Sequence, residues 1–251
     1  MVKSAPDGVM PRPLIIAGKQ DARPSGTSLA TIAYAPSCIL DPQSRTPRGT
    51  WGGTRNRADR SSLNLSAGNV LGMIEAACFA ERIGLAFNRH WTVHYEMAGI
   101  AEHEAAAFVG RLLAMVRKHV RRAGGELAAL WARENGDGKG GHVHILLHVP
   151  VGIMLRNRTW RWIKTAGGCP VRRVSHVRTI GGNLSNAQPT SAHYRRNADA
   201  VLAYLVKGAS DETGSALGLL QHGEGGRIIG KRCGTSQNIG ANARAKTRIN
   251  I

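Results

Sequence analysis

The sequence has little negative charge and no long apolar run. Asp and Glu together number 16 against 34 Lys and Arg, so the formal net charge of the 251 residues is +18, and the pI is near 11. This excess of positive charge implies a polyanionic partner, either a nucleic acid or an acidic membrane surface. The chain lacks the run of about 18 apolar residues that spans a bilayer, and it lacks a basic amphipathic segment rich in Trp or Phe. Nucleic acid is therefore the favoured partner, and no membrane partner is expected.

The sequence also has few cysteines. There are four of them, and they are spread along the chain without close pairs: Cys38, Cys78, Cys169 and Cys233. This spacing argues against a zinc ribbon and against a disulfide framework. The apolar run at residues 14–17 is too short for the core of a signal peptide. We therefore expect a cytoplasmic protein with reduced, structural cysteines.

A histidine-rich stretch at residues 140–150 predicts a β-strand. Side chains of a strand alternate between its two faces, so histidines line one face and aliphatic residues the other: His142, His144 and His148 against Val143, Ile145, Leu147 and Val149. Two imidazoles placed two residues apart on a rigid strand can hold one divalent ion. The alternative is that they are surface histidines on a half-buried strand.

Glu134 supplies a carboxylate close to these histidines. The residues between Glu134 and His142 form a polar, glycine-rich run that suits a hairpin turn. The strand that ends near Glu134 then folds back beside the histidine strand. One carboxylate and two imidazoles suit Mg²⁺ or Mn²⁺, and they suit Zn²⁺ less because no thiolate is near. The alternative for Glu134 is an ordinary solvated charge beside a turn.

A helix is predicted at residues 191–208, where apolar residues recur at helical spacing and Gly208 stands at the position of a C-terminal cap. Tyr204 and Lys207 lie three residues apart and share a face of this helix. A cation near Tyr204 favours the phenolate and can also hold a phosphate, as a tyrosine nucleophile requires. The alternative is a core tyrosine beside a solvated lysine at the helix end.

In this order and spacing, Glu134, the His142-Val-His144 strand and the Tyr204-Leu-Val-Lys207 helix resemble the HUH endonucleases. That family includes rolling-circle replication initiators, relaxases and single-strand transposases. The resemblance covers about residues 85–208 and implies an α+β fold, an antiparallel sheet with packed helices of the split βαβ (ferredoxin- or RRM-like) type. Residues 89–96 look like the family's first strand, although their role stays open.

The resemblance implies a reaction and a set of roles. Glu134, His142 and His144 are expected to bind Mg²⁺ or Mn²⁺, Tyr204 to attack the scissile phosphate of single-stranded DNA, and Lys207 to orient that phosphate. The product is a 5′-phosphotyrosine link with a free 3′-hydroxyl, at an origin or hairpin. A two-tyrosine variant that includes Tyr194 is conceivable, but Tyr194 has no lysine three residues later, so one tyrosine is favoured.

The rest of the chain divides into a leader, a catalytic domain and a tail. Residues 1–65 hold seven of the ten prolines and predict a flexible basic leader. Residues 66–210 form the predicted catalytic domain, with helices at 66–87 and 101–122, strands at 91–95 and 126–133, and helices on one face of the sheet. Residues 211–251 form a predicted glycine-rich basic tail that touches DNA backbone or is a poorly ordered end.

Basic and aromatic residues alternate between residues 151 and 190, as in grooves for single-stranded nucleic acid. The candidate contacts are Arg156, Arg158, Trp160, Arg161, Trp162, Lys164, Arg172 and Arg173. The segment that contains the last two is also expected to form a strand of the sheet. An equally weighted alternative is that the tryptophans belong to the core and the arginines are solvated.

Residues 225–232 come close to a phosphate-binding P-loop, but Arg232 stands where Ser or Thr is needed, and too little sequence follows for an ATPase. A helicase domain is therefore not expected, and a host helicase and polymerase are the expected partners. This favours a small plasmid or phage replication initiator, with a transposase or relaxase as alternatives. Two other readings stay open: a non-catalytic protein that binds single-stranded DNA or RNA, and a metal-dependent hydrolase that activates water.

Overall fold

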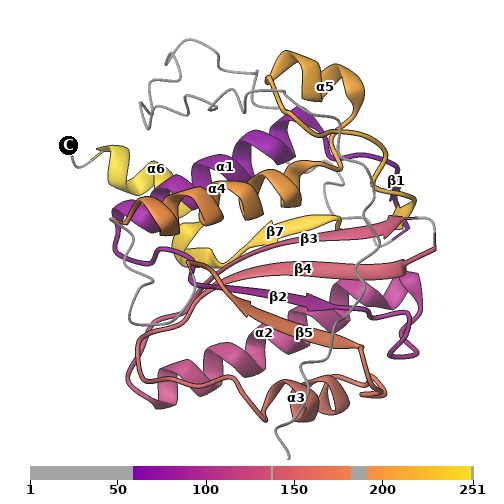
Figure 1. Ribbon diagram of the computed structural model, residues 1–251, viewed down its shortest axis with the longest axis vertical. Helices are drawn as coiled ribbons and strands as arrows, with labels where there is room; N and C mark the ends of the chain where they lie inside the picture. Colours follow the sequence, from indigo (N-terminus) through magenta and orange to yellow (C-terminus); the bar gives the residue numbers. More distant parts are fainter. Residues whose placement is uncertain (1–58, 137, 182–190, 250–251) are drawn as a thin grey trace, which may run out of the picture. The chain divides into compact units, whose positions relative to one another are not determined.

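The computed structural model describes residues 59–136, 138–181 and 191–249, so most of the predicted leader lies outside the described residues. The order of helices and strands is shown in Figure 1. Strands are β1 (Ser61–Ser62), β2 (Arg89–Val93), β3 (Ala128–Gly136), β4 (Gly140–His148), β5 (Ser175–Thr179), β6 (Ile228–Ile229) and β7 (Cys233–Thr235). Helices are α1 (Ala67–Arg82), α2 (Ala105–Arg122), α3 (Thr159–Thr165), α4 (Ala192–Val206), α5 (Asp211–Ala216) and α6 (Ala241–Ile249), with 3₁₀ turns η1 (Glu102–Glu104) and η3 (Gln237–Ile239).

The central feature is a five-stranded sheet in the order β5-β2-β4-β3-β7. Every neighbouring pair is antiparallel. The predicted hairpin is present, since Glu134 pairs directly with His142, although β3 runs two residues beyond Glu134. The α+β class with an antiparallel sheet and packed helices is therefore confirmed.

Helices cover both faces of this sheet, so the expectation of helices on one face was wrong. In Figure 1, α1 and α4 lie above the strands and α2 and α3 lie below them. The reason is that the central strands carry apolar residues on both faces: Trp131, Val143 and Ile145 pack with α2 and α3, whereas Leu130, Ala132 and Leu146 pack with α1 and α4. Two separate cores result.

The three long helices begin close to where the sequence predicts. Ser66 caps α1, and its Oγ accepts a hydrogen bond from the backbone N–H of Asn69. Ser191 caps α4 in the same way, through the N–H of Tyr194. Hydroxyl side chains at this position satisfy N–H groups that have no partner inside the helix. Because α4 begins at Ala192, its C-terminal turn lies over the sheet, where Lys207 reaches Glu134.

The segment after residue 210 is part of the sheet rather than a peripheral tail. Strand β7 pairs with β3, β6 pairs with β1, and α6 contacts α1. Within residues 225–232 there is no open phosphate loop, because Arg232 is buried and donates to the backbone carbonyls of Ser62 and Gly226. Ser62 and Leu65, which precede the predicted catalytic domain, pair with Ile228 of this segment and with Ala209.

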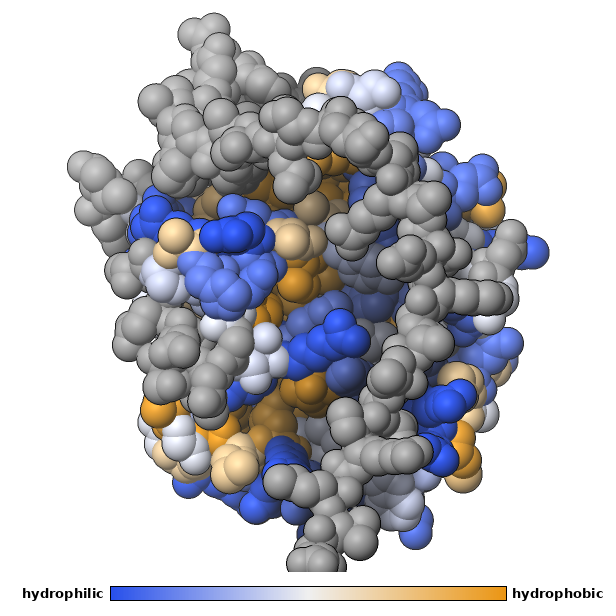
Figure 2. Space-filling view, in the orientation of Figure 1, coloured by the Kyte–Doolittle hydropathy of each residue, from blue (hydrophilic) through white to orange (hydrophobic). Residues whose placement is uncertain are grey.

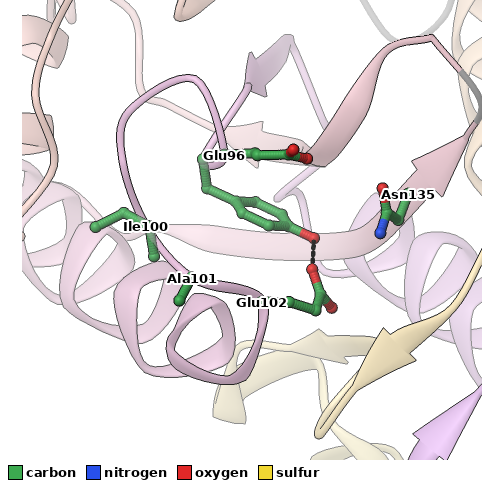
Figure 3. A pocket seen from close by; sticks show the side chains of 6 residues that line it. Glu96, Ile100, Ala101, Glu102 and Asn135 are labelled. Carbon is green, nitrogen blue, oxygen red and sulfur yellow. Dashed lines mark hydrogen bonds between the residues drawn. The ribbon is translucent and has the colours of Figure 1, made fainter.

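A buried arginine on β3 joins the turn η1 to the segment around β6. Arg133 is fully buried and donates to the carbonyl oxygens of Ile229 and Lys231, at 2.9 and 3.0 Å. It also forms an ion pair with Glu102, whose carboxylate accepts from the Tyr95 hydroxyl at 2.6 Å. The pocket drawn in Figure 3 is lined by Tyr95 and Glu102 among others, and by none of Glu134, His142 or His144. A buried cation is stable only when it is paired in this way.

The described surface in Figure 2 carries hydrophilic residues over most of its rim, and hydrophobic residues show mainly in the recessed middle. Among the helices of the described ranges, none combines the length and the apolar character needed to cross a bilayer.

Replacing Arg133 by Ala should lower the free energy of unfolding by about 3 kcal/mol or more, because the Glu102 carboxylate loses its buried partner and two carbonyls lose a donor. Urea denaturation measures this change. The exposed Arg121, replaced by Ala, is the control and should change stability by less than about 0.5 kcal/mol. Equal effects of the two substitutions would contradict the assigned role of Arg133.

Candidate metal and tyrosine site

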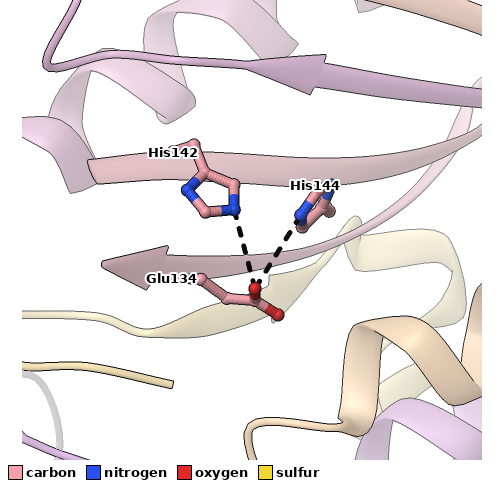
Figure 4. Close-up of side chains that lie close together, drawn as sticks. All are labelled: Glu134, His142 and His144. Carbon is pink, nitrogen blue, oxygen red and sulfur yellow. Dashed lines mark ion pairs between the residues drawn. The ribbon is translucent and has the colours of Figure 1, made fainter. Parts of the chain in front are cut away.

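Glu134, His142 and His144 form one buried cluster between β3 and β4. Their even-numbered positions place all three side chains on the face covered by α4. Glu134 Oε2 lies 3.6 Å from His142 Nε2 and 3.9 Å from His144 Nε2, as Figure 4 shows. One ligand atom from each residue lies within 4.8 Å of the others. The three residues that the sequence predicts as metal ligands are therefore brought together.

The cluster also has the free electron pairs that a metal ion needs. His142 Nδ1 lies 2.9 Å from the carbonyl oxygen of Gly140. A carbonyl only accepts, so Nδ1 carries a proton, and Nε2 is the nitrogen whose lone pair a metal ion would take. His144 Nε2 and Glu134 Oε1 are buried without a hydrogen-bond partner in the described part of the chain. Buried polar atoms without partners are uncommon, and a divalent cation would satisfy both.

The pKa values of Glu134 and His144 favour the protonation states in which these residues bind metal ions. Burial alone would raise the pKa of Glu134, but hydrogen bonds with His142 and Lys207 and the positive charge of Lys207 outweigh it and lower that pKa to about 2. Burial lowers the pKa of His144 to about 3, against the opposing effect of Glu134. At neutral pH the carboxylate is thus ionised and the His144 imidazole neutral, which are the forms that bind metals.

Lys207, the C-cap residue of α4, points into this cluster rather than into solvent. Its Nζ donates to Glu134 Oε2. Without a metal ion, this ammonium supplies the positive charge that the buried carboxylate requires. A divalent ion at the same oxygen would compete with it and leave Lys207 available for a phosphate.

Tyr204 lies against the cluster. Its ring meets the His144 ring edge-on, with centroids 4.9 Å apart, and Lys207 Nζ is 4.4 Å from the tyrosine ring centroid. The expectation that Lys207 favours the phenolate was wrong for this arrangement, because burial and the charge of Glu134 raise the pKa of Tyr204. The Lys207 ammonium is instead paired with the Glu134 carboxylate, so the Tyr204 phenol stays protonated at neutral pH.

Strand β2 and the residue that follows it, His94, add side chains to the site. His90 Nε2 and Thr92 Oγ1 lie 3.2 and 3.0 Å from His144 Nδ1, and the His94 ring stacks on the His142 ring with centroids 5.2 Å apart. Burial, with the charges of Arg178 and His176, lowers the pKa of His90 to about 4. The signal for these residues was present in the sequence, since His90, Thr92 and His94 recur at the two-residue period that is typical of a strand.

Two other residues near the predicted site are structural. His148 Nδ1 lies 2.8 Å from the carbonyl oxygen of Ala86, away from the cluster. Tyr194 is buried, and its hydroxyl donates to the carbonyl oxygen of Phe87 at 2.6 Å. Tyr194 therefore has a core position, whereas Tyr204 faces the cluster.

The basic and aromatic residues of the predicted groove are not brought to this site. Trp162 and Ile163 of α3 are buried in the core on the opposite face of the sheet, and the Trp162 ring packs 6.3 Å from the Trp91 ring. Trp162 is therefore a core residue, while Trp160 is 59% exposed. The six basic residues of the set are exposed: Arg156, Arg158, Arg161, Lys164, Arg172 and Arg173.

No protein-family model, curated protein or solved structure was found to match this chain. The geometry of the cluster therefore carries the functional argument.

Replacing His144 by Ala should weaken the binding of Mn²⁺ by about 100-fold or more, because a ligand in direct contact with a metal matters at least as much as its supporting residues do. Isothermal titration calorimetry of the full chain measures this loss. His148→Ala removes an imidazole from the same face of the same strand and should leave Mn²⁺ affinity within about twofold, since it lies outside the cluster. Wild-type affinity in His144→Ala would exclude this residue as a ligand.

In the presence of a chelator, the free energy of unfolding should fall as the pH decreases from 6.5. His90 and His144 have folded pKa values of about 4 and about 3, below the ordinary value of 6.5, so the unfolded chain binds more protons in this window. Each imidazole should contribute roughly 1 to 2 kcal/mol to the loss between pH 7 and pH 5. Urea denaturation at both pH values should show a smaller loss for His144→Gln than for wild type or His148→Gln. An unchanged loss in His144→Gln would contradict the depressed pKa.

Proposed function

We propose that this protein is a metal-dependent endonuclease and strand transferase that cuts single-stranded DNA through a covalent tyrosine intermediate. The observation that carries the proposal is the meeting of α4 with the hairpin: Tyr204 and Lys207 lie directly on the cluster of Glu134, His142 and His144. A phenol, an ammonium and a carboxylate–imidazole set in one place suit phosphodiester chemistry. The resemblance to HUH endonucleases in the order of these residues supports the same reaction.

In the proposed reaction, the Tyr204 hydroxyl oxygen attacks the scissile phosphorus, and the bond from phosphorus to the 3′-oxygen breaks. The phenol loses its proton, the departing 3′-oxygen gains one, and the 5′-phosphate stays on the tyrosine. The number of phosphodiester bonds is conserved, so a 3′-hydroxyl can reverse the step or complete a transfer. No oxidant or nucleotide cofactor is required.

Each side chain of the cluster has a defined part in this scheme. Glu134, His142 and His144 would hold Mg²⁺ or Mn²⁺, which supplies positive charge near the phosphate. Because Glu134 raises the pKa of Tyr204, neutralising that carboxylate favours loss of the phenolic proton. Lys207, once released from Glu134, can orient the phosphate. His90 and Thr92 hold the His144 ring through Nδ1.

The face of the sheet beside the cluster provides a surface along which single-stranded DNA can lie. His176 and Arg178 on β5 pair with Thr92 and His90, so they extend the same face, and both are exposed. An exposed guanidinium next to imidazole rings can contact phosphates and bases of a single strand. We propose that this reaction initiates rolling-circle replication of a plasmid or phage, with a host helicase and polymerase as partners.

The decisive experiment is covalent trapping. Purified protein is incubated with Mn²⁺ and a pool of labelled single-stranded oligonucleotides that includes sequences neighbouring its own gene, and is then denatured and run on a gel. Wild type should retain the label, and Tyr204→Phe should lose it while binding DNA nearly as before. Tyr194→Phe is the matched control and should retain the label, because that hydroxyl serves the fold.

The other outcomes separate the alternatives. A labelled Tyr204→Phe protein would remove Tyr204 as the nucleophile. Metal-dependent cutting without an adduct would indicate a hydrolase that activates water. Tight binding of the oligonucleotides without cutting or adduct would favour a non-catalytic binding protein.

A further inference from the structure

Two groups of exposed cations lie on the helices that cover the other face of the sheet. Helix α2 contributes Arg111, Arg117, Lys118, Arg121 and Arg122. The segment around α3 contributes Arg156, Arg158, Arg161 and Lys164. We call these two groups together the basic face.

The two groups are neighbours, and they point away from the sheet. Phe108 and Leu112 of α2 and Trp162 and Ile163 of α3 are buried in the same core, so both helices rest on one side of the strands. Arg111 Nε donates to the carbonyl oxygen of Ala166 at 2.9 Å, which joins α2 to the end of α3. The cluster of Glu134, His142 and His144 lies on the opposite side. The basic face is therefore separate from the proposed catalytic site.

The charge of the basic face is uncompensated. Neither α2 nor residues 138–181 contain any Asp or Glu. None of the ion pairs found between described residues includes a side chain of this face. Like charges gathered on one surface repel one another, and a polyanion bound there relieves that repulsion.

Two left-handed backbone conformations flank helix α3 in the sequence. Across the described ranges, the residues other than glycine with positive φ are Asn157, at 65°, and Arg173, at 71°. Asn157 lies between Arg156 and Arg158, and Arg173 follows shortly after α3. Such conformations are uncommon outside glycine and gather at functional sites.

The shape and chemistry of the basic face favour a duplex over a single strand. Arg111 and Arg122 are eleven positions apart in one helix, so the row of cations is about 16 Å long, close to the length of five base pairs. Contacts to stacked bases need exposed aromatic rings, but Trp162 is buried and Trp160 alone of the pair is exposed. One exposed ring, Trp160, thus stands among nine cations of the basic face, so contacts to phosphates rather than to bases dominate there.

We propose that the basic face binds the sugar–phosphate backbone of double-stranded DNA, without reading its sequence. One molecule could then hold a duplex on the α2 and α3 side while a single strand occupies the α4 side. The basic face is a different surface from the tyrosine site, and duplex binding there does not depend on cleavage.

The test is fluorescence anisotropy of a short blunt duplex of random sequence, with the full chain, a chelator and a series of potassium chloride concentrations. Arg117→Gln combined with Arg121→Gln should weaken binding roughly tenfold and reduce the slope of log K against log salt by about 2, since each phosphate contact contributes about 0.9. The matched control is Arg82→Gln combined with Lys246→Gln, which removes two exposed charges from α1 and α6. The control should retain the wild-type slope.

Three results would overturn the proposal. The first is an unchanged duplex affinity in the basic-face variant, or an equal loss in the control. The second is stronger binding of single strands with a loss in Trp160→Ala, which would indicate a stacking groove. The third is binding to vesicles that contain phosphatidylserine, lost in the basic-face variant while duplex binding stays intact. Covalent trapping on a short single strand is measured separately, so failure of the tyrosine chemistry and failure of duplex binding are distinguishable.

Discussion

The pairing of Glu134 with His142 across the β3–β4 hairpin is the constraint on which the site depends. Arg133 and Glu134 are consecutive residues of opposite charge, and both are buried on opposite faces of the strand. A shift of one residue in register would exchange them, placing the arginine among the histidines and the carboxylate beside Glu102. Both charges are stable only in the observed register, because each then meets its partner.

Close packing around the hairpin supports this register. A Cβ atom on Gly141 would collide with the Tyr95 ring, and one on Gly226 would collide with the backbone carbonyl of Asn135. Glycine is therefore required where the hairpin meets the end of β2 and the loop before β6. The Asn135 N–H donates to the carbonyl of Gly225 at 2.9 Å, which joins that loop to the hairpin. The end of the chain thus contributes to the position of the site.

The charged groups on the two faces of the sheet differ in burial and in pairing. On the α4 side, a buried carboxylate is balanced by Lys207 and surrounded by histidines with depressed pKa values, His90 and His144 among them. This small, buried arrangement is suited to exchanging one cation for another. On the α2 and α3 side, the cations are solvated and unpaired, which suits a large, wet polyanionic partner. The sheet separates the two and allows each to keep its own electrostatic character.

Local pattern was sufficient for the elements that carry Glu134, His142, His144 and Tyr204. Two-residue alternation identified the histidine strand, and the glycine-rich run identified the hairpin. The apolar stripe, with Gly208 as its C-terminal cap, identified α4. Each of these signals acts over a few residues. The meeting of α4 with the hairpin followed only from the resemblance and not from periodicity.

Tertiary structure decided what depends on distant residues. The pairing of β7 with β3 joins segments about a hundred residues apart, and no local signal marks a three-residue strand. Trp162 and Trp160 are two positions apart in one short helix, yet one is buried and the other exposed, because only packing against α2 and the sheet decides which side of that helix is covered.

The raised pKa of Tyr204, opposite to the expected direction, has the same origin. The sequence by itself determined that Lys207 is near the phenol, but the fold brought Glu134 into contact with the Lys207 ammonium. A buried carboxylate attracts a cation more strongly than a neutral phenol does.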